Sequence, residues 1–167
     1  TATPTGPTNS SSSSSSTSRP VTSTTVAGDP NVPAAARVNT DAGAEEFVKY
    51  YVQQINRALS GPDSTLLPRI SMDSCKTCAS INGSAAQLAL NGQRYVGVPI
   101  VVERLGLTSK NNDRQVFVGV YGNQPPSRIV DSHGKTVRTG TLRIIAFEFE
   151  LKFTDRWQTA AIRTVKS

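Results

Sequence analysis

An abrupt change in composition near Thr40 constrains this chain more than any other feature of its sequence. Nearly every residue from Thr1 to Val26 is Ser, Thr, Pro, Ala, Gly or Asn, and residues 10–16 are all serine. Ordering a chain costs roughly 1–2 kcal/mol per residue in backbone entropy, and this stretch has too few apolar side chains to offset that cost. The sequence therefore predicts a disordered linker over residues 1–40 and one folded domain over residues 41–167.

Residues 41–167 are long enough to bury a hydrophobic core without the help of a metal ion. No apolar run reaches the roughly 18 residues that a membrane-spanning helix requires. Because the chain opens directly in a linker and without an initiator Met, we expect an export signal upstream of Thr1, removed at a cysteine that bears a lipid.

An amphipathic helix is predicted to open the domain, within residues 37–60. Thr40 or Asp41 is the expected N-cap, and Gly61 with Pro62 ends the helix. A second long helix is predicted from residue 74 or 75 to residue 90. The apolar stripe of the first helix consists of Ala44, Phe47, Tyr51, Ile55, Ala58 and Leu59.

After Gly92 the pattern becomes that of strands joined by short turns. Strands are expected over residues 95–105, 115–121, 128–131, 135–138, 142–153 and 156–165. Helices followed by a run of antiparallel strands indicate an α+β fold, with the N-terminal helices packed on one side of a curved, mainly antiparallel sheet.

Three segments in this order resemble a known family. They are the helix over residues 46–56, which reads EFVKYYVQQIN, the motif Cys75-Lys-Thr-Cys78, and Arg156-Trp157 after an apolar strand. Together they resemble uncharacterised actinobacterial envelope lipoproteins, a family known as a domain of unknown function, and more broadly the NTF2-like (cystatin-like) cone fold. The resemblance covers about residues 41–165. It implies export, lipid anchoring ahead of the linker, and display outside the membrane of a Gram-positive bacterium. It implies no enzymatic activity.

Cys75 and Cys78 are the only cysteines, and three interpretations compete. An even count in an exported chain favours a disulfide that fixes the entry of the second helix. A Cys-x-x-Cys motif at a helix start is also typical of thiol–disulfide exchange proteins. A zinc site is a third interpretation, although tetrahedral zinc needs four ligands and the chain adds a single histidine, His133, to the two cysteines.

The remaining polar candidates for catalysis are few. His133 is expected in an exposed turn, and as a general base it would need Asp131 to orient its ring. Glu148 and Glu150 alternate with phenylalanines and are expected to face solvent. We find no nucleophile elbow, phosphate loop or dinucleotide fingerprint, so no catalytic, cofactor-binding or metal-binding residue is predicted.

Aromatic residues are the candidates for lining a pocket between helix and sheet, as the cone fold implies. These candidates are Phe47, Tyr51, Tyr95, Tyr121 and Trp157. The alternative interpretation places them in the core or at its rim.

The net charge of +6 is spread along the chain rather than gathered in one block. It is typical of a soluble basic face, or of contact with anionic wall polymers or lipid headgroups, and not of nucleic-acid binding. The leading hypothesis is a non-catalytic envelope domain that binds a partner protein, a wall polymer or a small apolar ligand. A small NTF2-like isomerase or dehydratase and an extracytoplasmic thiol–disulfide protein remain as alternatives. No cofactor is expected.

Overall fold

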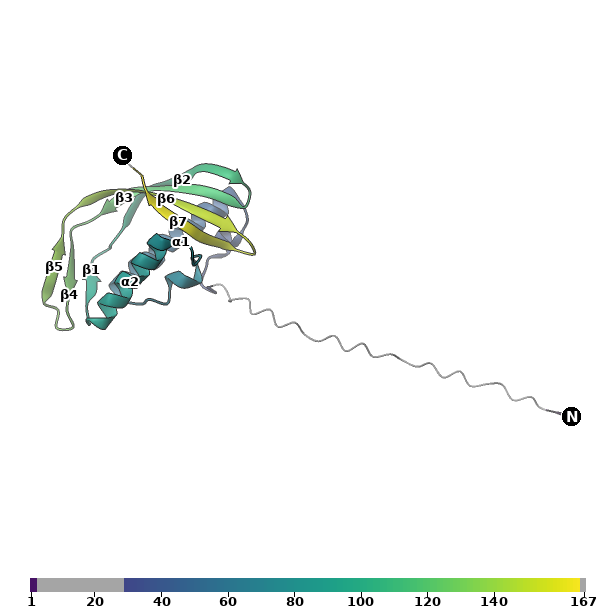
Figure 1. Cartoon of the computed structure of the whole chain (residues 1–167), viewed down its shortest axis with the longest axis horizontal. Helices are drawn as coiled ribbons and strands as arrows, with labels where there is room; N and C mark the ends of the chain where they lie inside the picture. Colours follow the sequence, from purple (N-terminus) through teal and green to yellow (C-terminus); the bar gives the residue numbers. More distant parts are fainter. Residues whose placement is uncertain (3–28, 166–167) are drawn as a thin grey trace.

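The computed structural model describes residues 1–2 and 29–165 (Figure 1). The disorder predicted for residues 3–28 therefore lies outside the described residues. The two long helices are α1 (Asp41–Ser60) and α2 (Lys76–Leu90), and short 3₁₀ helices occupy Ala34–Arg37 (η1) and Leu67–Arg69 (η2). The strands are β1 (Arg94–Val96), β2 (Val101–Asn112), β3 (Gln115–Gln124), β4 (Ser127–Val130), β5 (Thr136–Gly140), β6 (Arg143–Phe153) and β7 (Trp157–Thr164).

The strands form two antiparallel sheets, which together arch over the helices (Figure 1). The large sheet has the order β2-β3-β6-β7 and the small sheet the order β1-β4-β5. The α+β architecture with helices packed on antiparallel strands is thus confirmed, but the single predicted sheet is divided. Gly97, with φ of 101°, separates β1 from β2, and Pro125-Pro126 separates β3 from β4. Proline has no N–H for the ladder, which explains the second break.

The core lies between α1 and the large sheet. The predicted stripe of α1 is buried except for Leu59, which is partly exposed. It packs against alternate residues of β3, where Val116, Val118 and Val120 are at most 2% exposed. Phe149 of β6 meets Tyr51 of α1 edge to face, with ring centroids 5.7 Å apart. No helix in the described part of the chain is long and apolar enough to cross a membrane.

The structure differs from the predicted domain boundary at residue 40, because the described residues from Asp29 onward already pack on the domain. The Asp29 side chain is 6% exposed and accepts hydrogen bonds from the Tyr50 hydroxyl (2.7 Å) and from Asn31. The Trp157 indole N–H donates to the carbonyl of Val38 over 2.8 Å. Composition did not reveal this, because only Ala36 of this segment joins the core, with Val32 packed against it, and the bonds of Asp29 and Val38 reach residues far along the chain.

Helix α1 begins at Asp41 rather than at residue 37. Its N-cap is Thr40, whose hydroxyl accepts from the backbone N–H of Gly43 at 3.0 Å. A side chain at position 43 would collide with the Val38 carbonyl, so glycine lets the preceding segment turn back onto the helix. Strand β2 also extends to Asn112, beyond the predicted strand end at residue 105, and the turn before β3 is Asp113-Arg114.

Candidate binding cleft

A cleft opens between the small sheet, the end of α1 and the start of β6. Its volume is about 310 Å³, and a neighbouring hollow of about 400 Å³ beside α2 shares Tyr95, Ile129 and Arg138 with it. We call the two together the β5 cleft. Its lining comprises Leu59, Ser84, Gln87, Leu88, Asn91, Gln93, Tyr95, Pro99, Gln124, Pro125, Ser127, Ile129, Val137, Arg138, Thr139, Gly140, Thr141 and Arg143.

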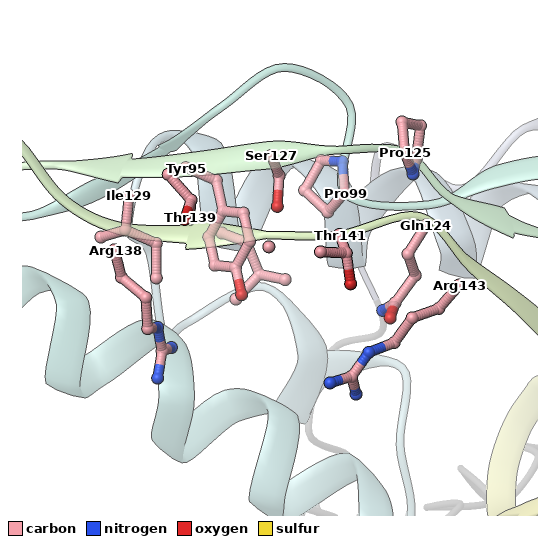
Figure 2. Close-up of a pocket in the computed structure, with 12 residues that line it drawn as sticks. Tyr95, Pro99, Gln124, Pro125, Ser127, Ile129, Arg138, Thr139, Thr141 and Arg143 are labelled. Atoms are coloured by element: carbon pink, nitrogen blue, oxygen red, sulfur yellow. The ribbon is translucent and has the colours of Figure 1, made fainter.

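Strand register places three of these side chains in one row across the small sheet. Tyr95 of β1 pairs with Ile129 of β4, which pairs with Arg138 of β5. Directly paired residues of antiparallel strands share a face, so the row forms one wall of the cleft. Figure 2 shows Tyr95 and Arg138 extending from these strands on the same side.

The other end of the cleft is fixed by α1. The Asn56 side chain donates to the carbonyl of Ile100 (2.8 Å) and accepts from its backbone N–H (2.9 Å). Both backbone groups of Ile100 are thereby tied to the helix, which holds the neighbouring Pro99 and Leu59 at the rim. The cleft is thus built on paired strands and a helix end, and its rim is held by a two-point contact.

The charged side chains of the β5 cleft are two arginines, Arg138 and Arg143. Figure 2 shows both extending toward the same space, with Gln124 beside Arg143. The cleft lining contains no Asp or Glu, and within residues 29–165 neither guanidinium forms an ion pair. By contrast, Arg163 pairs with Glu150 over 2.6 Å. Uncompensated guanidinium groups in a concavity give it a positive potential and the geometry to bind oxyanions.

Groups with shifted pKa values lie outside the β5 cleft. Burial raises the pKa of the Tyr51 hydroxyl to about 12, although Ser71 at 2.7 Å lowers it slightly. Burial and the carboxylate of Asp29 raise the pKa of Tyr50. Burial alone would raise the pKa of Asp29, but the hydrogen bonds from Asn31 and Tyr50 outweigh it and hold that pKa below its usual value. These groups stabilise the packing of α1.

The five predicted pocket residues do not share one pocket, although Phe47 and Trp157 border a separate hollow of about 270 Å³ near Asp29. Phe47, Tyr51 and Trp157 are core residues with at most 2% exposure, and Tyr95 lines the β5 cleft. Tyr121 lies outside both parts of the cleft lining, and the Arg104 guanidinium sits 4.6 Å from its ring centroid.

Glu150 also differs from the expectation of a solvated carboxylate. It is 9% exposed, pairs with Arg163, and accepts a hydrogen bond from Gln115 at 2.9 Å. Burial opposes ionisation, but the bonds from Arg163 and Gln115 lower the pKa of this carboxyl overall. The partners come from β3 and β7, which is why the local alternation in β6 did not reveal them. Glu148 accepts from the Thr108 hydroxyl on the neighbouring edge.

Cys75 and Cys78 lie at disulfide-bonding distance, with Cα atoms 5.2 Å apart. The Sγ of Cys75 also accepts a hydrogen bond from the backbone N–H of Cys78, so Cys75 is the N-cap of α2. Both cysteines are at most 3% exposed. Thiol exchange requires access of a second thiolate to the sulfur, so burial favours the structural interpretation over the redox one.

His133 lies in the exposed turn between β4 and β5. The carboxylate of Asp131 accepts from the backbone N–H groups of His133 and Lys135, so it closes the turn rather than orienting the imidazole. Among the described residues, no group of three His, Cys, Asp or Glu side chains is placed to hold a metal ion.

The basic residues, Arg138 and Arg143 among them, were expected on a solvent-exposed face, and the cleft that these two arginines share was not predicted. A partial signal was present, because residues 132–147 contain three Lys or Arg residues, Lys135, Arg138 and Arg143, and no Asp or Glu.

Comparisons with known proteins identify a family and a fold. The model of a family of unknown function (DUF6318) matches residues 23–160. No curated protein matches the sequence. Among solved structures, the crystal structure of the intermembrane space region of chloroplast protein ARC6 is similar, with a TM-score of 0.57 and 15% identity. The likeness covers 77% of this chain and 98% of that one, and it shows a shared fold.

Proposed function

We propose that this chain, which belongs to the DUF6318 family of unknown function, is a non-catalytic binding domain of a bacterial cell envelope. We propose further that the β5 cleft is its binding site. The observation that carries this proposal is the lining of the cleft. It contains two unpaired arginines and several hydroxyl groups, but no Asp, Glu, His, Lys or Cys that could act as a base or activate a hydroxyl. Such a lining suits recognition of a ligand.

The position of the N-terminal segment supports display of the cleft. Residues 34–37 pack on α1, and Asp29 is bonded to Tyr50 at the midpoint of that helix, on the side of the molecule away from β4 and β5 (Figure 1). Tyr50 is the tenth of the 20 residues of α1, so about 15 Å of helix separates it from the end that borders the cleft. A linker that joins the domain at Asp29 would leave the β5 cleft facing away from the point of attachment.

We further propose that the protein is an actinobacterial lipoprotein, anchored by a lipid on a cysteine upstream of the linker, with an NTF2-like cone as its fold. The order of elements and the arch over two helices support the cone. A domain of similar fold occurs in the intermembrane space region of ARC6, which is consistent with a place in an envelope compartment.

Mapping the ligand-induced changes by NMR tests the binding site. Titrating the labelled full chain with a solubilised envelope fraction of the source organism should shift the amide resonances of Tyr95, Ile129 and Arg138. Thr141→Trp, at an exposed position of the lining, should suppress these shifts, while Ser80→Trp on the exposed side of α2 should not. Shifts confined to Arg104 and Tyr121 would move the binding site to the opposite face of the large sheet.

Protease treatment of intact cells tests the location. The domain should be cleaved without lysis, and a cytoplasmic marker protein should stay intact. Protection of the domain in intact cells would contradict display outside the membrane.

A further inference from the structure

Strand β5 ends the small sheet with an unpaired edge. Its neighbour on one side is β4, no strand among residues 29–165 pairs with its other side, and all five of its residues are exposed. The edges of the large sheet are different. The backbone N–H of Met72 and the carbonyl of Ile70 both bond to Thr159 of β7, at 2.9 and 3.0 Å, and so cover that edge. Register shifts at three places interrupt β2. Bulges of this kind are a common protection against pairing with another strand.

Resting on the proposed function, we propose that the β5 edge and the β5 cleft hold an extended acidic segment of a partner protein. The segment forms a ladder of backbone hydrogen bonds with β5 and places carboxylates at Arg138 and Arg143. An added strand presents every second side chain to the face on which Arg138 lies, with about 7 Å between successive ones. Carboxylates in those positions meet guanidinium groups that have no other partner in the cleft.

Charge rules out a second copy of this chain as the occupant. Pairing of β5 with its own copy would place the Arg138 side chains of both chains in the same strand pair, and residues 132–147 contain no acidic side chain to compensate. Like charges directly opposite one another destabilise a strand pair. The occupant must therefore supply the negative charge.

The lining favours a peptide over a phosphate-bearing polymer. A polymer of that kind would satisfy the arginines but would leave the backbone groups of β5 without partners. The cleft also presents apolar surface from Tyr95 and from Val137, which is 47% exposed. A peptide that combines carboxylates, apolar side chains and an extended backbone complements all three features.

Binding of defined peptides to the full chain tests the proposal. The probe is a capped ten-residue peptide in which Glu alternates with Val or Thr, and its charge-reversed counterpart has Lys in place of Glu. A third peptide carries N-methyl groups on alternate amides, which removes donors without changing charge. Calorimetric titration should show the Glu peptide binding about tenfold more tightly than either of the other two.

Matched variants locate the site. Arg138→Gln combined with Arg143→Gln should weaken binding of the Glu peptide about tenfold, as expected for the loss of two partly exposed charge pairs. Arg128→Gln is the control: Arg128 is an exposed arginine of β4 that is outside the cleft lining and adjacent in sequence to the inward-facing Ile129. It should change the affinity by less than about twofold. Thermal melting of each variant checks that the fold is intact.

Three results would overturn the proposal. One is equal affinity of the Glu peptide for the double variant and the unmodified protein. Another is that the unmodified protein binds the N-methylated peptide as tightly as the Glu peptide. The third is tight, arginine-dependent binding of inorganic polyphosphate when the Glu peptide does not bind. In each case, resonance shifts in the cleft on titration with the envelope fraction would leave the proposed function standing, and their absence would remove it as well.

Discussion

The large and the small sheet continue the same hairpins, yet they are stabilised in different ways. In the large sheet, Val118 and Leu151 are fully buried and alternate with outward-facing residues, so the sheet forms the core with α1. In the small sheet, β4 contributes Ile129 and Val130 to the buried set, whereas every residue of β5 is exposed. The large sheet therefore carries the stability of the fold. In the small sheet, the Arg138 charge and the free edge of β5 are exposed, and we expect neither to contribute much to stability.

Truncation of a core aromatic residue tests this contrast most strongly. Phe149→Ala should lower the free energy of unfolding by about 3–5 kcal/mol, because it removes a buried ring that packs against Tyr51. Val137→Ala in β5 should cost less than about 0.5 kcal/mol. Urea denaturation of both variants gives the comparison, and costs of similar size would show that the small sheet shares the core's role.

Removing the Asp29 carboxylate should have the next largest effect. Asp29→Ala leaves the buried Tyr50 hydroxyl without its acceptor, at a cost of about 1–3 kcal/mol. Asp63→Ala is the control, because Asp63 bonds only to its exposed neighbour Thr65. A loss no greater than that of the control would mean that residues 29–40 contribute little to the domain.

The effect of Asp29 should also depend on pH. Its folded-state pKa lies below the usual value, so its ionised form stabilises the fold above about pH 4 and this contribution is lost as the pH falls through the lowered pKa. The stability difference between Asp29→Ala and the unmodified protein should therefore shrink below about pH 4. Urea titrations over a series of acidic pH values measure it, and a difference that grows on acidification would contradict the sign.

Replacing both cysteines should have a smaller effect. The loop between Cys75 and Cys78 is short, so Cys75→Ser with Cys78→Ser should cost less than the ~3 kcal/mol of a 15-residue loop. Scanning calorimetry should show a modest fall in Tm, and reduction of the unmodified protein should give a similar one. An unchanged Tm together with weakened ligand binding would argue against a purely structural role.

The smallest effect on stability is expected at the cleft itself. Arg138→Gln with Arg143→Gln should change the free energy of unfolding by less than about 0.5 kcal/mol, because neither side chain is buried or paired. Urea denaturation measures it. A clear loss of stability would show that these arginines support the fold, and the assignment of the cleft as a binding site would lose its main argument.

The sequence pattern predicted the helices and strands, because their formation depends on residues that lie close together in the chain. The stripe of α1 follows from helical periodicity, and the strands from β-branched runs broken by Gly, Pro and Asn. The packing of Asp29 on Tyr50 could not be predicted, because it depends on one hydrogen bond across 21 residues. The β5 cleft was also missed, since the row of Tyr95, Ile129 and Arg138 arises only when three strands pair. The sequence shows that arginines are present, but only the folded arrangement of β5 and β6 places Arg138 and Arg143 in one cleft.

The segment that begins at Asp29 has a mechanical consequence. A force applied to the chain ahead of Asp29 would first load the hydrogen bond between Asp29 and Tyr50. It would also load the two bonds that the Arg37 guanidinium donates to the carbonyls of Pro30 and Val32, at 2.7 and 2.8 Å. Further along the chain, the hydrogen bond between the Trp157 indole and the Val38 carbonyl would be loaded next. The Asp29 contact is at the midpoint of α1, and none of these bonds involves a residue that lines the β5 cleft. A force on the chain ahead of Asp29 would therefore act first on contacts that do not form the cleft.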